Sequence, residues 1–369
     1  MIKVLSIFGT RPEAIKMAPL VKALSGQDGI ESKVAVSAQH REMLDQVLPV
    51  FEIKPDYDLD IMRPGQSLED ITAAALKGLS AVIAGCRPQL VLVHGDATTA
   101  LAGALAAFYA KIPCGHVEAG LRSAGKFAPF PEEINRRLIT VLADYHFAPT
   151  PSAEQNLLRE NVPKDRVFVT GNTVIDALVD VSRRECDLSL HGLEQVDWQK
   201  RVILLTCHRR ENWGRPMHDI FQAVKRVLER HDDVEVIFPM HKNPLVRETA
   251  RRVLGGLARV RLTEPLEYLP FCHVLRRCHL VMTDSGGLQE EAPALGKPVI
   301  VLREVTERPE AVEAGAACLA GVGSDSVSAA LDALLTDKAL YEKMARAVNP
   351  FGDGQAAQRI VKIILEKLG

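Results

Sequence analysis

The amino-acid sequence predicts an α/β protein with two Rossmann-like, doubly wound domains that face a cleft. Short apolar runs alternate with longer helical patterns from end to end. These apolar runs are continuous rather than alternating, which is typical of parallel strands buried on both faces. The series lapses into mixed polar sequence over residues 180–200 and then restarts. Because 369 residues at roughly 150 per domain suggest two or three domains, we interpret the lapse as a domain boundary.

The first half of the chain carries six apolar runs that we expect to be strands. They cover residues 4–7, 34–36, 90–93, 114–117, 145–148 and 167–170. Helical patterns over residues 12–24 and 98–109, and another from about Arg41, lie between them. This alternation predicts a doubly wound sheet in an N-terminal domain of residues 1–172.

The second half repeats the pattern in what we expect to be a second domain, residues 173–352. The expected strands cover residues 202–205, 234–238, 260–262, 280–282 and 299–302. A turn-rich stretch at residues 349–354 precedes an amphipathic pattern over residues 355–368. We expect this closing segment, residues 353–369, to pack back on the N-terminal domain as a helix.

Composition excludes several classes of protein. Hydrophobic residues make up 47% of the chain, and 45 Lys and Arg oppose 47 Asp and Glu, for a net charge of -2. This balance excludes intrinsic disorder and argues against a nucleic-acid partner. The seven cysteines are odd in number and lack C-x-x-C spacing, which favours reduced core thiols. We find no signal-peptide pattern and no stretch long enough to span a bilayer, and therefore expect a cytoplasmic protein without a membrane partner.

The residues that follow each strand are the candidates for function, because ligands bind at the carboxyl ends of strands in open α/β sheets. Arg11 and Lys16 follow the first expected strand and flank the start of a helix, a position that attracts anions. A solvated basic pair is the alternative interpretation. No G-x-G-x-x-G or P-loop pattern follows any strand, which weakens dinucleotide-binding and kinase interpretations.

Carboxylates end two neighbouring expected strands. Asp96 and Glu118 each follow a histidine by two residues, His94 and His116 respectively. Such a pair suits acid–base chemistry. Two alternatives stay open: Asp96 as the cap of the next helix, and a metal site formed with the histidines.

A proline-flanked loop then begins a helix with paired charges. Glu132 and Glu133 precede Arg136 and Arg137, so the pairs are spaced i,i+4. Ion pairing along one helix would explain this spacing without any function.

In the second half, basic and glycine-rich segments follow the strands. His208, Arg209 and Arg210 come directly after one strand and predict a phosphate-facing cluster, and His241 ends the next strand. A later strand runs into Ser285, Gly286 and Gly287 and then a helix, which predicts an anion cradle of backbone N–H groups. Two residues near this cradle, a ribose acceptor and a further cation, are Glu291 and Arg308.

The motifs together resemble the non-hydrolysing UDP-N-acetylglucosamine 2-epimerases. The matching segments include FGTRPEAIKMAP, HGD, GHVEAGLR, PEEINRR, GNTVIDAL, HRREN, TDSGGLQEEAP, TERPEA and NPFGDG, in order along nearly the whole chain. The resemblance implies a GT-B-like pair of Rossmann domains, a homodimer, no metal and no cofactor. It also implies interconversion of UDP-GlcNAc and UDP-ManNAc, which supplies N-acetylmannosamine units for bacterial surface polysaccharide.

The resemblance also assigns roles to residues. Loss of the anomeric UDP gives C1 oxocarbenium character, which acidifies the C2–H bond, and a carboxylate then removes that proton to leave 2-acetamidoglucal. The implied catalytic residues are Asp96, Glu118, Glu132 and His208. The implied substrate-binding residues are Arg11, Lys16, Arg136, Arg209, His241, Leu266, Phe271, Ser285, Gly286, Gly287, Glu291 and Arg308. Phe271 matches the position that packs on uracil, and Leu266 the position whose backbone reads the base.

Some bacterial members of the family carry a second, activating UDP-GlcNAc site. Gln39, Arg209 and His241 match it, whereas Glu42 and Gly65 replace the expected glutamine and arginine. Rival functions are a GT-B glycosyltransferase, a hydrolysing epimerase, and a nucleotide-sugar sensor without turnover. An NAD-dependent epimerase is disfavoured by the missing glycine fingerprint.

Overall fold

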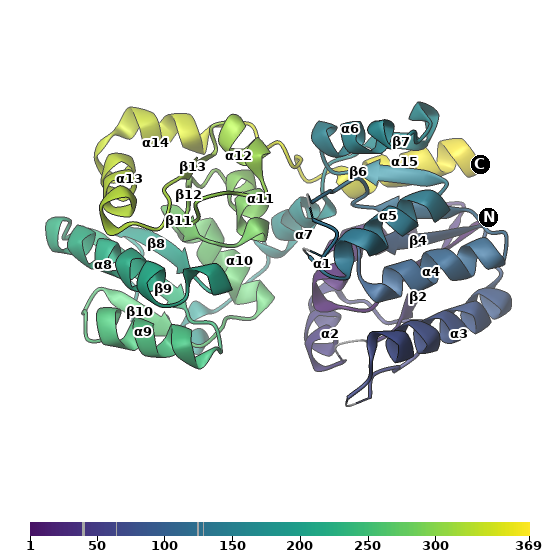
Figure 1. Ribbon diagram of the computed structural model, residues 1–369, viewed down its shortest axis with the longest axis horizontal. Helices are drawn as coiled ribbons and strands as arrows, with labels where there is room; N and C mark the ends of the chain where they lie inside the picture. The colour runs from purple at the N-terminus through teal and green to yellow at the C-terminus, as the bar shows by residue number, and fades with distance from the viewer. Residues whose placement is uncertain (39–40, 64, 124, 128) are drawn as a thin grey trace. The chain divides into compact units, whose positions relative to one another are not determined.

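The computed structural model describes residues 1–38, 41–63, 65–123, 125–127 and 129–369 (Figure 1). It divides into two compact units. Unit 1 comprises Met1–Ala177 together with Phe351–Gly369, and unit 2 comprises Leu178–Pro350. Each unit contains one sheet whose described strand pairs are all parallel. Parallel strands flanked by helices confirm the predicted class of two Rossmann-like domains.

The sheet of unit 1 has the strand order β3-β2-β1-β4-β5-β6-β7 in the described residues. Its strands are β1 Ile2–Phe8, β2 Ile30–Val36, β3 Tyr57–Asp58, β4 Leu90–His94, β5 Cys114–Val117, β6 Tyr145–Ala148 and β7 Val167–Val169. The chain runs outward from β1 to one edge and then returns past β1 to the other. The reversal between β1 and β4 is the switch point at which doubly wound sheets bind ligands.

Helices pack on the sheet of unit 1 in two groups. The helices are α1 Arg11–Ser25, α2 Arg41–Val47, α3 Leu68–Cys86, α4 Thr98–Tyr109, α5 Glu132–Leu142, α6 Pro151–Arg159, α7 Thr173–Val181, which runs on past the limit of the unit, and α15 Ala356–Leu368, with short 3-10 turns η1 Pro49–Phe51 and η2 Lys164–Arg166. Figure 1 shows α3 and α4 side by side, and α4 also contacts α5. In the other group, α1 contacts both α2 and the C-terminal helix α15.

The sheet of unit 2 has the strand order β10-β9-β8-β11-β12-β13. Its strands are β8 Arg201–Thr206, β9 Val234–Pro239, β10 Val260–Thr263, β11 Leu280–Thr283, β12 Val299–Val301 and β13 Ala317–Leu319. The helical segments are η3 Leu188–His191, η4 Arg210–Asn212, α8 Arg215–Arg230, α9 Pro244–Leu254, α10 Tyr268–Arg277, α11 Gly286–Ala294, α12 Pro309–Glu313, α13 Ser324–Thr336 and α14 Lys338–Ala345. Its switch point lies between β8 and β11.

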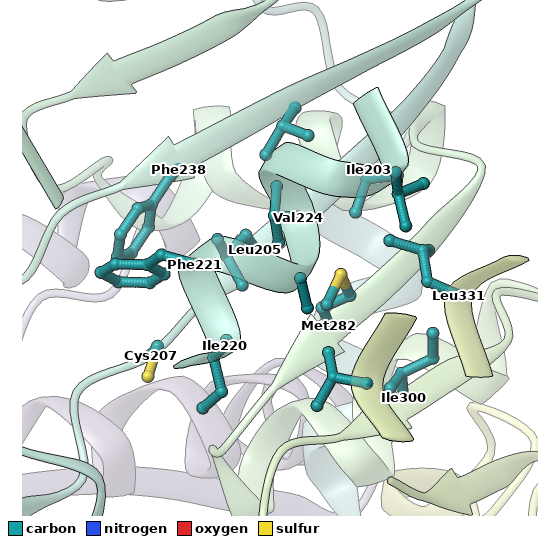
Figure 2. Close-up of a cluster of buried hydrophobic side chains, with 14 of the residues drawn as sticks. Ile203, Leu205, Cys207, Ile220, Phe221, Val224, Phe238, Met282, Ile300 and Leu331 are labelled. Atoms are coloured by element: carbon teal, nitrogen blue, oxygen red, sulfur yellow. The ribbon is translucent and has the colours of Figure 1, made fainter. Parts of the chain in front are cut away.

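Apolar side chains from the sheet and from α8 and α13 form the core on one face of unit 2 (Figure 2). Ile203 and Leu205 of β8 pack against Phe221 and Val224 of α8. The rings of Phe221 and Phe238 are tilted at 59° with centroids 5.4 Å apart, a favourable geometry for aromatic pairs. The strands and helices are thus held by apolar contacts, and the polar residues that follow the strands lie outside this core.

The predicted strands agree with those observed to within a few residues at their ends. The strands β3 and β13 were not predicted, because each is a two- or three-residue edge strand without a long apolar run. All seven cysteines are free. No helix within the described residues is both long and apolar enough to cross a membrane.

Candidate active site

Glu118 is oriented by groups from three other segments of unit 1. It directly follows β5 with a left-handed backbone (φ 64°), which is uncommon for a residue other than glycine. Its Oε2 atom forms an ion pair with Nζ of Lys16 from α1 and accepts a hydrogen bond of 2.9 Å from Nδ2 of Asn172. Nε2 of His94 lies 3.8 Å from the same oxygen. A lysine and an amide donor therefore stabilise the charged form of this carboxylate.

Asp96 lies at the end of the neighbouring strand β4 and pairs with an arginine. Nη2 of Arg136 is 2.7 Å from Oδ2 of Asp96, and Nδ2 of Asn135 donates a 2.8 Å hydrogen bond to its backbone oxygen. Burial raises the pKa of Asp96, and the Glu118 and Glu132 carboxylates raise it further, while Arg136 opposes this. The alternative that Asp96 caps the next helix is wrong, because α4 begins at Thr98 with Ala97 as its cap residue.

The two histidines before these carboxylates are buried, and His116 links the ends of the two strands. Nε2 of His116 lies 2.7 Å from the backbone oxygen of Gly95, in the turn that leads to Asp96. Burial lowers the pKa of His94 to about 4 and that of His116 to about 3. Among the described residues, no group of three or more His, Cys, Asp or Glu side chains is arranged to hold a metal ion.

Of the charged residues at the start of α5, one pair forms contacts within the helix and the others join the carboxylate cluster. Glu133 is buried and accepts hydrogen bonds from the Ser123 backbone and hydroxyl at 2.9 and 3.0 Å and from Nε of Arg137 at 2.7 Å. These bonds lower the pKa of Glu133 although its burial acts to raise it. The expected pairing of Glu133 with Arg137 is therefore confirmed, whereas Arg136 turns to Asp96 instead of Glu132. The charge of Glu132 acts on Asp96, so this carboxylate belongs to the same cluster.

The turn between β1 and α1 requires glycine. A Cβ atom on Gly9 would lie 2.0 Å from Oγ of Ser37 and 2.5 Å from Oγ1 of Thr99. The next residue, Thr10, caps α1, and Glu13 completes the capping box by accepting hydrogen bonds from both backbone N–H groups of the turn, at 2.9 and 2.8 Å. Burial raises the pKa of Glu13 to about 7. Arg11 is the first residue of α1 and is partly exposed beside this turn.

In unit 2, His208 lies at the end of β8 beside the buried carboxylate of Asp284. Nδ1 of His208 is 3.2 Å from Oδ1 of Asp284. Burial lowers the pKa of His208, and His241 and Arg209 lower it further, while Asp284 opposes them. The rings of His208 and His241 are stacked with centroids 5.6 Å apart.

The helix α11 begins at Gly286 with Ser285 as its cap residue, and within the described residues no side chain caps its first turn. A Cβ on Gly286 would lie 3.8 Å from both Nη2 of Arg209 and Oε2 of Glu307, and 4.0 Å from Cζ of Arg308. A Cβ on Gly287 would lie 3.6 Å from Oε1 of Glu291. The start of this helix therefore presents backbone N–H groups and two guanidinium groups to a shared space, a favourable place for phosphate.

The arginines beside α11 are held by acidic side chains. Nε of Arg308 pairs with Glu290, and the Arg308 backbone N–H donates a 2.9 Å bond to Thr306. Nη2 of Arg209 is 3.7 Å from Oε2 of Glu307. These contacts fix both guanidinium groups near the helix start.

The two predicted base-recognition residues lie in the loop after β10 and at the start of α10. Leu266 is in the connecting loop, Phe271 is in the first turns of α10, and both are partly buried. Of the predicted second site, Gln39 and the side chain of Glu42 lie outside the described residues, while Gly65 has a positive φ of 76° with open space at its Cβ.

Sequence reasoning missed two residues that orient the predicted groups. Asp284 was read only as part of a strand end, and Asn172 only as part of a motif. Asp284, like His208, follows an expected strand, so its place at a strand end could be predicted, but its contact with His208 depends on the pairing of β8 with β11. Asn172 is 54 residues from Glu118, and no sequence pattern marks their contact.

Comparison with known proteins provides an independent finding. Residues 22–365 match the family described as UDP-N-acetylglucosamine 2-epimerase. The UDP-N-acetylglucosamine 2-epimerase of Bacillus subtilis is 53% identical over 368 residues, which cover 100% of this chain and 96% of that protein. The enzyme of the same name from Escherichia coli K12 is 52% identical over 370 residues, covering 98% of each. The solved structure of UDP-GlcNAc 2-epimerase from Neisseria meningitidis bound to UDP-GlcNAc is similar with a TM-score of 0.87 at 48% identity, covering 99% of this chain and 100% of that one.

Proposed function

The chain belongs to the UDP-N-acetylglucosamine 2-epimerase family, and from this premise we propose that it interconverts UDP-GlcNAc and UDP-ManNAc. The observation that carries the proposal is the carboxylate cluster of unit 1, in which Glu118 and Asp96 are each held by a cation at adjacent strand ends. Inversion at C2 without an added redox partner needs one group to remove the C2 proton and another to return it. The cluster supplies both.

The proposed reaction begins with cleavage of the C1–O bond, whose electron pair leaves with UDP. The oxocarbenium character at C1 then acidifies C2–H. In the direction of UDP-ManNAc, Glu118 accepts this proton, because Lys16 and Asn172 stabilise its anion. The product of this step is 2-acetamidoglucal.

The return step delivers a proton to the opposite face of C2 and rebuilds the C1–O bond with UDP. The raised pKa of Asp96 suits it to the acid role, since a carboxyl group that holds its proton more firmly than usual can carry that proton to C2. Arg136 keeps this carboxyl in place. In the reverse reaction the two carboxyl groups exchange roles, as microscopic reversibility requires.

We propose that unit 2 supplies the groups that bind the nucleotide. His208 and the start of α11, with Arg209 and Arg308, hold the diphosphate as it departs. The family resemblance implies that Glu291 accepts hydrogen bonds from the ribose hydroxyls. It also implies that Phe271 packs on the uracil and that the backbone of Leu266 reads the base.

The test is to give the protein UDP-GlcNAc alone and to identify the products by anion-exchange chromatography and NMR. The proposal predicts UDP-ManNAc as the main product. Free ManNAc and UDP as main products would instead identify a hydrolysing epimerase. If the sugar is transferred only after an acceptor is added, the protein is a glycosyltransferase of similar fold.

We further propose that the protein is a homodimer in the cytoplasm, where nucleotide sugars are made. Exposed apolar side chains gather on the contacting helices α4 and α5 of unit 1, namely Phe108, Tyr109, Leu138 and Val141. Such a patch marks an interaction site in a protein rich in charged surface. Light scattering after size-exclusion chromatography should give twice the chain mass for the native protein and one chain mass for Val141→Asp. The matched control is Val348→Asp, an equally exposed valine of unit 2.

A further inference from the structure

His208 and Asp284 lie at the ends of two hydrogen-bonded strands. In the register of β8 and β11, Thr206 pairs with Thr283, so the residues that follow lie side by side. The Asp284 side chain is 0% exposed, whereas the His208 side chain is 36% exposed. The carboxylate therefore lies behind the histidine, away from solvent.

One oxygen of Asp284 fixes the turn after β8. Oδ2 accepts hydrogen bonds from the backbone N–H groups of His208 and Arg209, both at 2.8 Å, and from Nδ2 of Asn212 at 3.0 Å. Three N–H donors on one oxygen suit a negatively charged carboxylate. Oδ1 is thereby left to interact with groups on its other side.

Nδ1 of His208 faces that second side, at 3.2 Å from Oδ1. The thiol of Cys207 also lies near the carboxylate, and its pKa is raised well above its usual value by burial and by Asp284. Because the thiol stays neutral, His208 is the partner that can carry positive charge opposite this carboxylate.

We propose that Asp284 is a positioning residue that holds the proton of His208 on Nδ1 and so presents Nε2 to the departing diphosphate. When His208 is protonated, Nε2–H donates to a phosphate oxygen and Asp284 stabilises the imidazolium from behind. The kinetic consequence of this pairing rests on the proposed function, whereas the state of the histidine does not.

The remaining neighbours of His208 make this support necessary. His241, which follows β9, stacks on the ring, and Arg209 is the next residue along the chain. Both disfavour an additional positive charge on His208, as does burial. Among the groups that act on His208 in the described residues, Asp284 is the anion that offsets them.

The test is Asp284→Asn, a nearly isosteric change. Its amide oxygen can keep the three hydrogen bonds of Oδ2, while its NH₂ group faces Nδ1 and forces the proton to Nε2. We expect ¹⁵N NMR of the free protein, assigned with His208→Gln, to show Nδ1–H in the native chain and Nε2–H in the variant. The pKa of His208 should fall in the variant, and turnover should fall at least about 100-fold.

Asn212→Ala is the matched control, because it removes one donor to Oδ2 and leaves the approach of Oδ1 to Nδ1 intact. It should keep the native tautomer and pKa of His208 even if it lowers the unfolding temperature. An unchanged tautomer and pKa in Asp284→Asn would overturn the proposal. If that variant does not fold, the native spectrum decides, since a proton on Nε2 in the native chain also overturns it. If the native protein shows the Nδ1–H signal but makes no UDP-ManNAc, the proposed reaction is refuted while the role of Asp284 in placing the proton stands.

Discussion

The two units build polar clusters at the same place in the fold but use charge in opposite ways. Both clusters follow adjacent parallel strands at or next to a switch point. These strands are β4 and β5 in unit 1, where the switch point lies between β1 and β4, and β8 and β11 in unit 2. In unit 1, the functional candidates are carboxylates, and Lys16 and Arg136 support them as cations. In unit 2 the candidate is a histidine, and a buried carboxylate supports it.

Under the proposed function, this difference would let one scaffold serve two steps of a reaction. A group that must exchange a proton with a C–H bond needs a carboxylate whose protonation is adjusted by nearby charge. A group that must meet a departing diphosphate needs a positive or hydrogen-bonding face towards the ligand. The parallel sheet provides the same edge in both cases, and the residues after its strands set the sign of the charge.

The largest expected effect comes from removing a carboxylate of unit 1. Glu118→Gln keeps the size of the side chain and can still meet Lys16 and Asn172, but it cannot accept a proton. We expect turnover to fall at least about 100-fold with little change in KM, as loss of acid–base catalysis implies. Steady-state kinetics with UDP-GlcNAc measure this.

Glu160→Gln is the control for that change. Glu160 is also an ion-paired carboxylate of unit 1, but its partner is Arg122 and not a member of the carboxylate cluster. Nε and Nη2 of Arg122 donate hydrogen bonds of 2.7 and 2.6 Å to the two oxygens of Glu160. Its loss should leave turnover within about threefold of the native value, since partly exposed ion pairs contribute little. Equal losses in both variants would mean that the effect of Glu118 is structural.

A smaller and different effect is expected from the helix start of unit 2. Gly287→Ala places a methyl group at an ordinary contact distance from Glu291, so the fold should tolerate it. The methyl group would crowd a phosphate at the N-terminus of α11, and we expect KM to rise about tenfold, or about 1.4 kcal/mol of binding, with little change in kcat. Gly85→Ala on α3, where nothing lies near the added carbon, should change neither. A loss confined to kcat in Gly287→Ala would break the division of roles between the units.

Asn172 tests how much the amide hydrogen bond to Glu118 contributes to turnover beside the ion pair with Lys16. Asn172→Ala removes the amide that donates to Glu118 but leaves Lys16 in place. We expect turnover to fall at least about tenfold, since a hydrogen bond to a charged group contributes about 1.5 to 3 kcal/mol. Native turnover in this variant would show that the lysine alone sets the state of Glu118.

The smallest expected effect concerns stability in acid. His116 is buried and its pKa is lowered to about 3, so it stays neutral in the folded chain while the unfolded chain binds a proton below pH 6.5. Its stabilising contribution is present above pH 6.5 and is lost as the pH falls towards 3, at a cost of about 2 kcal/mol by pH 5. The drop in unfolding temperature between pH 7 and pH 5 should therefore be a few degrees smaller in His116→Gln than in the native chain. The exposed His218 of α8 gives the control, His218→Gln, in which that drop should be unchanged.

Much of the fold could be predicted from the sequence because buried parallel strands leave continuous apolar runs. The strand at Cys114–Val117 and the helix at Thr98–Tyr109 were predicted with their observed limits. The strand at Tyr57–Asp58 could not be predicted, because a two-residue edge strand is defined by its neighbour and not by its own sequence.

The site was predictable only where a side chain follows a strand in a recognisable motif. The closeness of Asp96 and Glu118 followed from adjacent strand ends. The ion pair between Arg136 and Asp96 could not be predicted. Helical spacing favours Glu132 as the i,i+4 partner of Arg136, and only tertiary packing brings Asp96 closer. The role of Asp284 likewise depends on the register between two strands that are far apart in sequence.

The most direct test of the central claim is the fate of the C2 hydrogen when the protein acts on UDP-GlcNAc in D₂O. Proton removal and return by carboxyl groups predicts UDP-ManNAc that carries deuterium at C2, visible as the loss of the C2 proton signal by NMR. UDP-ManNAc that keeps its original hydrogen at C2 would contradict the account, because the hydrogen would then have moved without exchange with the carboxylates of unit 1.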